Sequence, residues 1–253
     1  MPSAPRVALV TGVGRRRGIA AAVARGLAED GWDLFLSYWT PYDERLGMER
    51  GDGDPHHIGE ELRALGRRVV VQSGDLEDAA VASHLVSAAV CELGRCDALV
   101  MAHCESVDST IASTTVESFD RHYRVNVRAS WLLIRAFAEA ASDGGSIVAL
   151  TSDGTRANVP YGSTKGALDR LVVAAAHELG PRRIRANLVN PGPVDNGWMT
   201  EEIRRSVHAA TPAGDVGTPE TVSDLVRFLV SERGRWINGQ LILSNGGSNT
   251  PIA

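Results

Sequence analysis

The sequence is almost without lysine: of its 26 Lys and Arg side chains, only one is a lysine, Lys165. Arg can replace Lys wherever positive charge alone is needed, but it cannot supply a compact ammonium group whose pKa shifts readily on burial. The one lysine stands four residues after Tyr161, in the segment Tyr-Gly-Ser-Thr-Lys. Chance could place it there, but the spacing makes Tyr161 and Lys165 the first candidates for a chemical role.

Cysteine is scarce as well. Cys91, Cys96 and Cys104 are an odd number of thiols, and their spacing is not that of a metal site. We interpret them as reduced thiols, mostly buried for structural reasons, in a cytoplasmic protein. We therefore expect no metal site.

Long hydrophobic runs and a strong excess of charge are also absent. No apolar stretch approaches the ~20 residues that span a bilayer, and the first residues lead directly into a strand-like segment. We therefore expect neither a membrane partner nor a secretory signal. The net charge of −5 does not favour nucleic acid as a partner.

Short apolar segments alternate with helical ones along the whole chain, which indicates parallel strands joined by crossover helices. The expected strands are Arg6–Thr11, Asp33–Tyr38, Arg68–Gln72, Ala98–Met101, Ser146–Thr151, Arg185–Asn190 and Gln240–Leu243. The expected helices are Ile19–Asp30, His57–Leu65, Asp78–Leu93, Val116–Ala141, Tyr161–Leu179 and Pro219–Ser231. The predicted fold is one α/β domain over residues 1–253, a doubly wound Rossmann-type sheet of seven parallel strands with helices on both faces.

Two segments fit this alternation poorly. Trp39–Pro55 is rich in Gly, Asp and Arg, and Gly192–Val216 contains a short helical stretch. In open α/β sheets the ligand lies beyond the carboxyl ends of the strands. Gly192–Val216 follows the sixth expected strand, so it is placed to cover a ligand as a short lid.

The first expected strand leads into a glycine-rich turn and then into a helix. Gly12, Gly14 and Gly18 would let the backbone approach a pyrophosphate, and the helix beginning at Ile19 would offer free N–H groups. An ordinary strand-to-helix turn is the alternative. The position after the first strand favours a dinucleotide site.

Three consecutive arginines, Arg15, Arg16 and Arg17, lie in this turn. Guanidinium groups bind phosphate and would suit the extra 2′-phosphate of NADP; a solvated basic loop is the alternative. A carboxylate at the end of the second strand would bind the ribose of NAD and repel that phosphate, but the sequence has no acid there until Asp43. We therefore expect NADPH or NADP to be preferred over NAD.

These features follow one another in a particular order over nearly the whole chain. The order is Thr11-Gly12 and Gly18-Ile19, then Asn126, Ser152, Tyr161 and Lys165, then Asn190-Pro191-Gly192. With nearly these separations, the sequence resembles the short-chain dehydrogenase/reductase family, and within it the 3-oxoacyl-carrier-protein reductase (ketoreductase) subgroup.

The resemblance implies a catalytic role for four residues. Tyr161 would give a proton to a carbonyl oxygen while hydride reaches the carbon, and Ser152 would orient that carbonyl, with Thr151 as the alternative. Lys165, on the same helical face as Tyr161, would lower the pKa of Tyr161 and hold the nicotinamide ribose. Asn126 would hold a water that connects Lys165 to solvent.

The resemblance also implies cofactor contacts outside the glycine turn. Asp75 and Leu76 match the position of the family's adenine contact. Pro191, Gly192 and Val194 match the segment that binds nicotinamide, and Tyr161 and Lys165 would touch the same part of the cofactor. Among the three arginines of the turn, Arg17 matches the family position best.

The chain departs from the family pattern on both sides of this site. The glycine turn is about two residues longer than usual. Met101–Cys104 replaces the family's Asn-Asn-Ala-Gly, which puts a Cys104 side chain where the cofactor passes. Neighbours in an extended segment face opposite sides, so His103 and Cys104 do not suit a nucleophile pair. Asn196 stands where the family often has a threonine, and the Ser152–Tyr161 loop is shorter than usual.

The leading functional hypothesis is an NADPH-dependent oxidoreductase that reduces a ketone or 3-oxoacyl carbonyl on a small or carrier-bound substrate. The unusual Met101–Cys104 segment leaves open a cofactor-binding scaffold or sensor without redox turnover. An enzyme of secondary metabolism with a different net reaction is a third possibility.

The fourth expected helix carries Arg121, Arg124, Arg128 and Arg135, which could dock an acidic carrier protein. A solvated helix face or ion pairs at an interface are the alternatives. In the family, the fourth and fifth helices pack into a dimer that is commonly doubled to a tetramer. We therefore expect a homo-oligomer.

Overall fold

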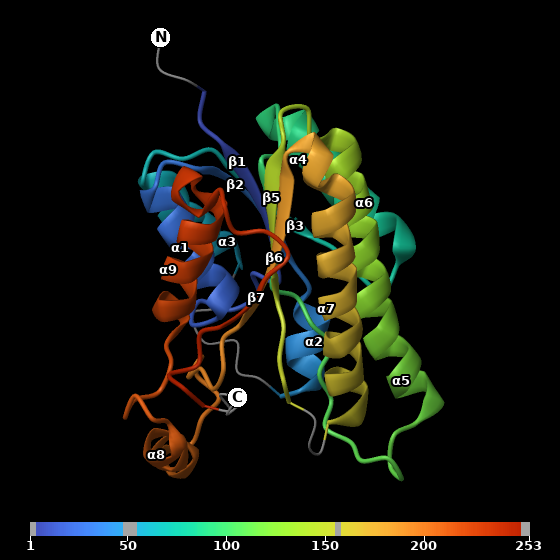
Figure 1. Ribbon diagram of the computed structural model, residues 1–253, viewed down its shortest axis with the longest axis vertical. Helices are drawn as coiled ribbons and strands as arrows, with labels where there is room; N and C mark the ends of the chain where they lie inside the picture. Colours follow the sequence, from blue (N-terminus) through green and yellow to red (C-terminus); the bar gives the residue numbers. More distant parts are fainter. Residues whose placement is uncertain (1–3, 48–54, 155–157, 249–253) are drawn as a thin grey trace.

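One sheet of seven parallel strands forms the centre of the molecule, in the order β3-β2-β1-β4-β5-β6-β7 (Figure 1). The computed structural model describes residues 4–47, 55–154 and 158–248. The strands are Val7–Thr11 (β1), Asp33–Tyr38 (β2), Val69–Ser73 (β3), Ala98–Met101 (β4), Gly145–Leu150 (β5), Ile184–Asn190 (β6) and Leu241–Leu243 (β7). This confirms the predicted fold, with every strand boundary within one residue of its expected place.

Helices cover both faces of the sheet. They are Ile19–Glu29 (α1), Thr40–Arg45 (α2), Pro55–Ala64 (α3), Ala79–Leu93 (α4), Val116–His122 (α5), Ala129–Ala140 (α6), Val159–Leu179 (α7), Glu201–Ala210 (α8) and Pro219–Val230 (α9), with short turns at Tyr123–Arg128 (η1), Gly180–Arg182 (η2) and Glu232–Gly234 (η3). Figure 1 shows α1, α3 and α9 on the left of the sheet and α4, α6 and α7 on the right. No helix in the described ranges is long and apolar enough to cross a bilayer.

The inner strands are apolar along their whole length because both of their faces are covered. All five residues of β1 and all four of β4 are buried. One core packs β-sheet side chains against α4, α6 and α7 around Phe137. The other packs them against α1, α3 and α9 around Leu34 and Leu36. The continuous apolar runs in the sequence have their physical origin in this double burial.

The chain reverses its winding direction between β1 and β4. Strand order runs outward from β1 to β3 on one side and from β4 to β7 on the other. The crossover segments therefore diverge at this point and leave room beyond the carboxyl ends of the strands, where ligands of such sheets bind. In Figure 1 these ends point downward, toward α2 and α8.

The two segments that fitted the alternation poorly contain helices. Trp39–Pro55 includes α2, with Pro41 in the first turn of the helix, where its missing N–H costs nothing; residues 48–54 lie outside the described ranges. Gly192–Val216 includes α8. The single expected helix Val116–Ala141 is divided into α5 and α6 by η1, a π-helical turn.

Helices α1 and α9 approach closely at Gly26. A β-carbon at this position would lie 2.6 Å from the Ser223 Oγ and 2.5 Å from the Arg227 Cδ, whereas one at Gly166 of α7 would meet nothing within 4 Å. Both glycines are helical. Alanine substitutions at the two positions therefore separate the effect of helix propensity on stability from the effect of packing.

We expect Gly26→Ala to lower the free energy of unfolding by about 1–3 kcal/mol because α9 must move away. Gly166→Ala should raise it by up to ~1 kcal/mol through helix propensity alone. Urea unfolding of the two variants checks this. Equal stability of both variants would contradict the close packing of α1 on α9.

Candidate active site

The turn between β1 and α1 brings its backbone against the segment that follows β4. Gly12 has a φ of +81°, and a β-carbon there would lie 2.8 Å from the His103 backbone nitrogen. Only glycine suits both this conformation and this approach. Gly18, whose N–H donates to the Arg15 carbonyl at 3.0 Å, precedes α1 without any side-chain cap. The first N–H groups of α1 are thus left for a ligand or solvent.

Two cavities lie beyond the carboxyl ends of the strands. The first, of about 250 Å³, lies beyond the ends of β1, β2, β3 and β4. Its lining includes Gly12, Gly14 and Arg15 of the turn. The second, of about 540 Å³, lies past β5 and β6, and Ile19 is part of its lining. The turn borders the first cavity and the first residue of α1 borders the second, so one extended ligand could contact both.

The three arginines of the turn point to different places. Arg15 lines the first cavity, and its Nε lies 3.4 Å from the Asp43 Oδ1. Arg16 forms an ion pair with Glu61 of α3. Arg17 is exposed and lines a separate hollow between α8 and the start of α9. The structure thus places Arg15 in the first cavity, and not Arg17, which the sequence favoured.

The expectation that no carboxylate lies near the end of β2 is wrong because of Asp43. In the sequence it lies beyond Tyr38, but α2 turns back so that the Asp43 carboxylate is buried and lines the first cavity. A β-carbon at Gly14 would lie 2.8 Å from the Asp43 Oδ2. A carboxylate therefore stands at the edge of the cavity where the sequence predicted none.

Asp75 and Leu76 follow β3 and line the first cavity, in the position that the sequence analysis gave them. The Asp75 Oδ1 accepts a hydrogen bond from the Glu77 backbone N–H at 2.9 Å, which fixes a turn directly after the strand. Leu76 is buried.

Ser152 and Tyr161 face each other across the second cavity. Ser152 follows β5, Tyr161 lies in the first turn of α7, and both side chains line this cavity. The described ends of the short loop therefore keep the two hydroxyls together; residues 155–157 lie outside the described ranges. Burial raises the pKa of Tyr161, charge at Cys104 raises it further, and the Ser152 hydrogen bond lowers it. The net shift is upward because burial dominates, and Lys165 is not among its causes, so the lowering of the Tyr161 pKa by Lys165 stays a prediction.

Lys165 is buried, with 3% of its surface exposed. Its Nζ donates to the Leu150 carbonyl at 2.8 Å and lies 5.4 Å from the centre of the Tyr161 ring. Burial lowers the pKa of Lys165, while negative charge at Cys104 and Asp169 raises it. The ammonium group is thus held beside Tyr161 at the end of β5.

Thr151, the alternative to Ser152, faces a different partner. Its Oγ1 donates to the Asp169 Oδ1 at 2.5 Å. It therefore ties the end of β5 to α7, although Thr151 and Ser152 both line the second cavity.

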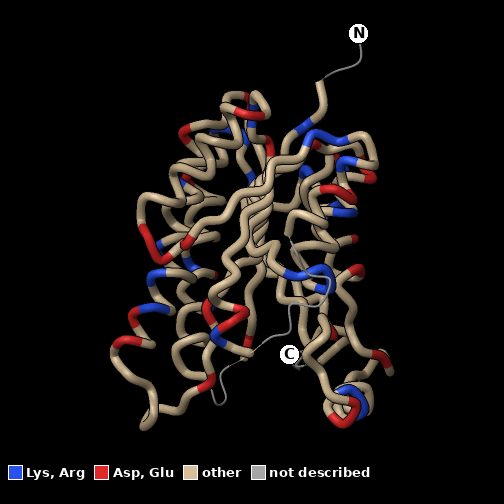
Figure 2. Tube along the Cα trace, turned by 180° about the vertical axis from the view of Figure 1, so that it is seen from behind, with Lys and Arg blue, Asp and Glu red and all other residues tan. Residues whose placement is uncertain are grey.

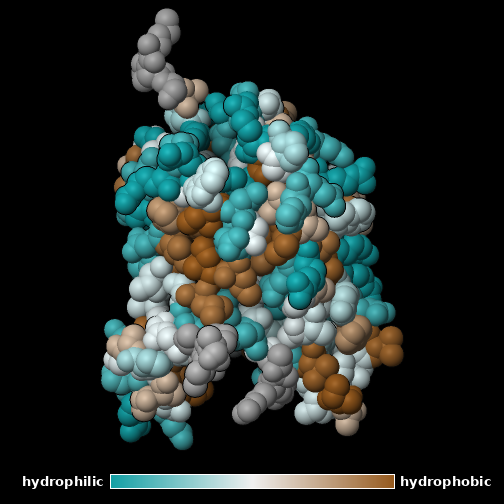
Figure 3. Space-filling view, viewed as in Figure 1, coloured by the Kyte–Doolittle hydropathy of each residue, from teal (hydrophilic) through white to brown (hydrophobic). Residues whose placement is uncertain are grey.

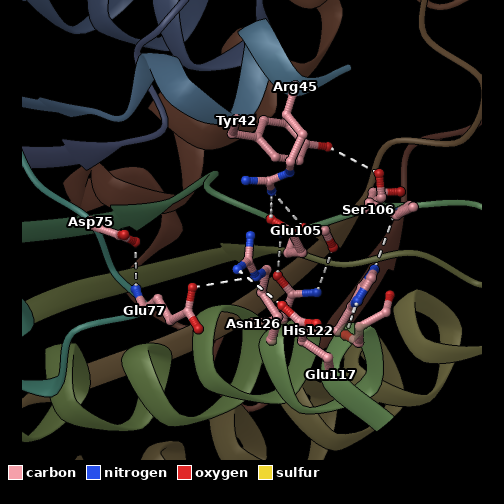
Figure 4. Close-up of polar contacts among 12 residues, drawn as sticks. Tyr42, Arg45, Asp75, Glu77, Glu105, Ser106, Glu117, His122 and Asn126 are labelled. Carbon is pink, nitrogen blue, oxygen red and sulfur yellow. Dashed lines mark hydrogen bonds and ion pairs between the residues drawn. The ribbon is translucent and has the colours of Figure 1, made fainter. Parts of the chain in front are cut away.

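Asn126 lies buried in the π-helical turn η1, and such turns occur frequently at functional sites. Its Oδ1 accepts from the Glu105 N–H at 2.7 Å, and its Nδ2 donates to the Glu105 carbonyl and to the Thr164 Oγ1, both at 2.9 Å (Figure 4). Both amide N–H groups are used within the protein. A water at Asn126 would therefore donate to its acceptor oxygens.

Helix α2 is fixed to the segment that follows β4, beside the first cavity. The Arg45 Nη2 lies 2.7 Å from both carboxylate oxygens of Glu105, and the Tyr42 hydroxyl donates to the Ser106 carbonyl at 3.3 Å (Figure 4). From the other side, the Asn158 Nδ2 donates to the Ser106 Oγ at 2.9 Å. None of these residues was among the predicted site residues, although Pro41 suits the first turn of a helix.

His103 and Cys104 both border the first cavity, but the His103 ring is engaged by hydrogen bonds with other elements. The His103 Nδ1 lies 2.7 Å from the Thr11 Oγ1 and its Nε2 lies 3.4 Å from the Ser130 Oγ, so the ring joins β1 to α6. Cys104 lines the first cavity. Of the three cysteines only Cys96 is buried, and burial raises its pKa to about 12.

The segment after β6 packs tightly at Gly192. This residue has a φ of +64°, and a β-carbon added to it would lie 2.4 Å from the Asn245 Cβ. Pro191 and Gly192 line the second cavity, and Val194 is buried beneath it. Asn196 also lines this cavity, and its buried Oδ1 has no hydrogen-bond partner among the described residues. A buried amide oxygen of this kind suits a ligand that donates a hydrogen bond.

The four arginines of the fourth expected helix do not form a free basic patch. Arg121 and Arg124 pair with Glu77 at 3.4 and 3.2 Å, and Arg135 pairs with Glu139 at 3.0 Å. Arg128 donates to the Glu77 carbonyl. Figure 2 shows acidic positions interspersed with basic ones over the surface. This arrangement favours the alternative of paired surface charges over a dock for an acidic carrier.

Comparison with known proteins agrees with this geometry. A family model described as enoyl-(acyl carrier protein) reductase matches residues 12–249. A short-chain dehydrogenase/reductase of Hericium erinaceus is 34% identical, over 97% of this chain and 98% of the relative. The chain belongs to the short-chain dehydrogenase/reductase family. It is therefore an oxidoreductase, as the order of its motifs predicted.

Other members of the short-chain dehydrogenase/reductase family extend the likeness. The NADPH-dependent aldehyde reductase-like protein of Arabidopsis thaliana chloroplasts is 33% identical, over 98% of this chain and 95% of the relative. The structure of a Burkholderia cenocepacia short-chain dehydrogenase in complex with NADP superposes with a TM-score of 0.86 at 30% identity, covering 98% of this chain and 99% of that one. The likeness thus extends over the whole fold.

The hydrogen bonds of His103 lead to a prediction about acid stability. Burial and the nearby Lys165 lower the pKa of His103 to about 3, whereas an unfolded histidine titrates at about 6.5. Between these values the unfolded chain binds more protons, so the free energy of unfolding falls as pH decreases below about 6.5. One such group contributes a slope of up to about 1.4 kcal/mol per pH unit.

We expect His103→Asn to flatten this slope between about pH 6.5 and 5, because Asn does not titrate there. Urea unfolding at a series of pH values measures it. His84→Asn, which removes an exposed histidine of α4, should keep the wild-type slope. An unchanged slope in His103→Asn would show that the folded histidine takes up its proton normally.

Proposed function

We propose that this enzyme uses NADPH to reduce a carbonyl group, of ketone or 3-oxoacyl type, to an alcohol, with Tyr161 as the proton donor. The observation that carries the proposal is that Ser152 and Tyr161 line one cavity, with the buried ammonium of Lys165 5.4 Å from the centre of the Tyr161 ring. Ser152 and Tyr161 line the second cavity, which the first residue of α1, Ile19, also borders. Proton donor, orienting hydroxyl and dinucleotide cradle therefore meet at one place.

The residues around the two cavities fit a nicotinamide dinucleotide. The glycine turn and the uncapped start of α1 suit the pyrophosphate. Asp75 and Leu76 would border the adenine, and Pro191, Gly192 and Val194 the nicotinamide. The related Burkholderia enzyme was solved with NADP, which supports the same class of cofactor here.

The pKa values support the direction of proton transfer. Burial raises the pKa of Tyr161, so its hydroxyl is protonated at neutral pH and can donate to a carbonyl oxygen. When bound, the reduced cofactor supplies the hydride. Ser152 would hold the carbonyl oxygen within reach of Tyr161, and Lys165 would stabilise the phenolate by its charge. Asn126, through its acceptor oxygens, would hold the water that resupplies the proton.

Segment 192–216 would act as a lid over the substrate. Trp198 is 54% exposed, and Val207 and Ala210 of α8 line the second cavity. An exposed tryptophan beside a cavity offers apolar surface that a substrate can cover. This supports a substrate with an apolar part next to its carbonyl.

We expect Tyr161→Phe to reduce ketone-dependent oxidation of NADPH by about 10²–10⁴-fold, the usual contribution of a general acid. NADPH affinity, followed by fluorescence titration, should change little because only one hydroxyl is lost. Tyr123→Phe, in η1 and outside both cavities, is the matched control and should keep full activity.

Two outcomes would contradict the proposal. Equal rates for the wild type and Tyr161→Phe across a panel of ketones would remove Tyr161 from the chemistry. Tight NADPH binding by the wild type without turnover of any ketone or alcohol would favour the cofactor-binding sensor.

We also propose that the protein is a homo-oligomer. Val116, Phe119 and Trp131, on α5 and α6, are 79%, 37% and 47% exposed, and Trp131 lines an apolar hollow of about 500 Å³. On the sheet edge, β7 exposes Leu241 and Leu243, where Figure 3 shows a hydrophobic area over the middle of the molecule. Apolar surfaces of this extent are typical of contacts between protein chains.

Light scattering after size exclusion should give a mass of two or four chains. Trp131→Glu should shift the mass downward because a charge would be buried in the contact. Leu65→Glu, at an exposed site just after α3, should leave it unchanged. A monomeric wild type would contradict the proposal.

A further inference from the structure

The first cavity holds an unusual balance of charge for a site expected to bind a phosphate. We propose that Asp43 weakens the discrimination between NADPH and NADH, because its carboxylate offsets the charge of Arg15 where an adenosine 2′-phosphate would bind. This inference rests on the proposed use of a nicotinamide cofactor. It goes beyond that proposal by assigning the choice between the two cofactors to a residue of α2.

Arg15 is the arginine of the turn that is available to this part of the site. It lines the first cavity together with Ser37, Tyr38 and Trp39 from the end of β2. Arg16 is engaged with Glu61 of α3, and Arg17 lies in the hollow beside α8. Recognition of a 2′-phosphate by the arginine-rich turn therefore depends on Arg15.

Asp43 lies beside Arg15 in the lining of the first cavity. Its Oδ1 lies 3.4 Å from the Arg15 Nε, and the exposed fractions of the two side chains are 11% and 26%. Its Oδ2 packs so closely on the turn that a β-carbon at Gly14 would lie 2.8 Å away. At this separation and degree of burial, water screens the two charges less than it does on an open surface.

The other cations of the cavity are also paired. Among the described residues that line it are three arginines, Arg15, Arg45 and Arg121, and four acids, Asp43, Asp75, Glu77 and Glu105. Arg45 is held by Glu105 and Arg121 by Glu77. The described lining is thus not net positive, and a 2′-phosphate would meet as much negative charge as positive.

Asp43 is the acid whose removal changes the phosphate site itself. Glu105 and Glu77 act on arginines that come from α2 and α5, whereas Asp43 acts on the arginine of the glycine turn. A neutral side chain of the same shape would leave Arg15 in place with its charge uncompensated. NADH, which has no 2′-phosphate, would gain nothing from the change.

The test is fluorescence titration of the full-length protein with NADPH and with NADH. We expect Asp43→Asn to tighten NADPH binding by about ten-fold and to change NADH binding by less than about two-fold, the scale expected when a like charge is removed beside a phosphate. Asp224→Asn removes the same charge from an exposed position on α9 and should change neither affinity. Asp43→Ser provides a second neutral variant, and thermal unfolding checks that each variant is folded.

The outcomes separate this inference from the proposed function. If the wild type binds both cofactors and neither folded Asp43 variant binds NADPH more tightly, the role given to Asp43 is wrong and the proposed function stands. Loss of affinity for both cofactors in the variants would also overturn it, because Asp43 would then only support the site. If the wild type binds neither cofactor, the proposed function fails and the inference fails with it.

Discussion

The burial of one ammonium group constrains the whole catalytic end of this molecule. A charged group can remain inside a protein only if hydrogen bonds and opposite charge compensate for the lost water. Lys165 obtains them from the Leu150 carbonyl at the end of β5 and from Asp169 one turn further along α7. This requires α7 to dock against β5, and the docking brings Tyr161 to Ser152. The geometry of the site thus follows from the need to satisfy a single buried cation.

The segment after β4 is the second support of the site, and it is held from three directions. Arg45 and Tyr42 fix it from α2, Asn126 from the π-helical turn, and Asn158 from the start of α7. These contacts are polar and at least partly buried, so losing one partner would leave another group with fewer hydrogen bonds. Such networks favour a single arrangement of the walls of both cavities.

The sequence predicted the features that depend on local pattern. The inner strands were visible because burial on both faces makes them continuously apolar. The Tyr161–Lys165 pair was visible because one turn of helix fixes its spacing. Features set by partners distant in the sequence were not predictable. Arg17 was preferred over Arg15 because it matches the family position. The sequence does not show that α2 brings Asp43 to Arg15 and that α3 brings Glu61 to Arg16. The upward shift of the Tyr161 pKa was not predictable because desolvation is a property of the folded site, and the π-helical turn leaves no periodic signal.

The isolation of Lys165 has a consequence for covalent modification. Lysine acetylation, methylation and attachment of modifier proteins all act on an ε-amino group, and this protein has one such group, buried at its catalytic end. The exterior of the folded chain carries its positive charge as guanidinium. A modifying enzyme would therefore first have to reach an amino group that the fold buries, and acetylation there would remove the charge beside Tyr161.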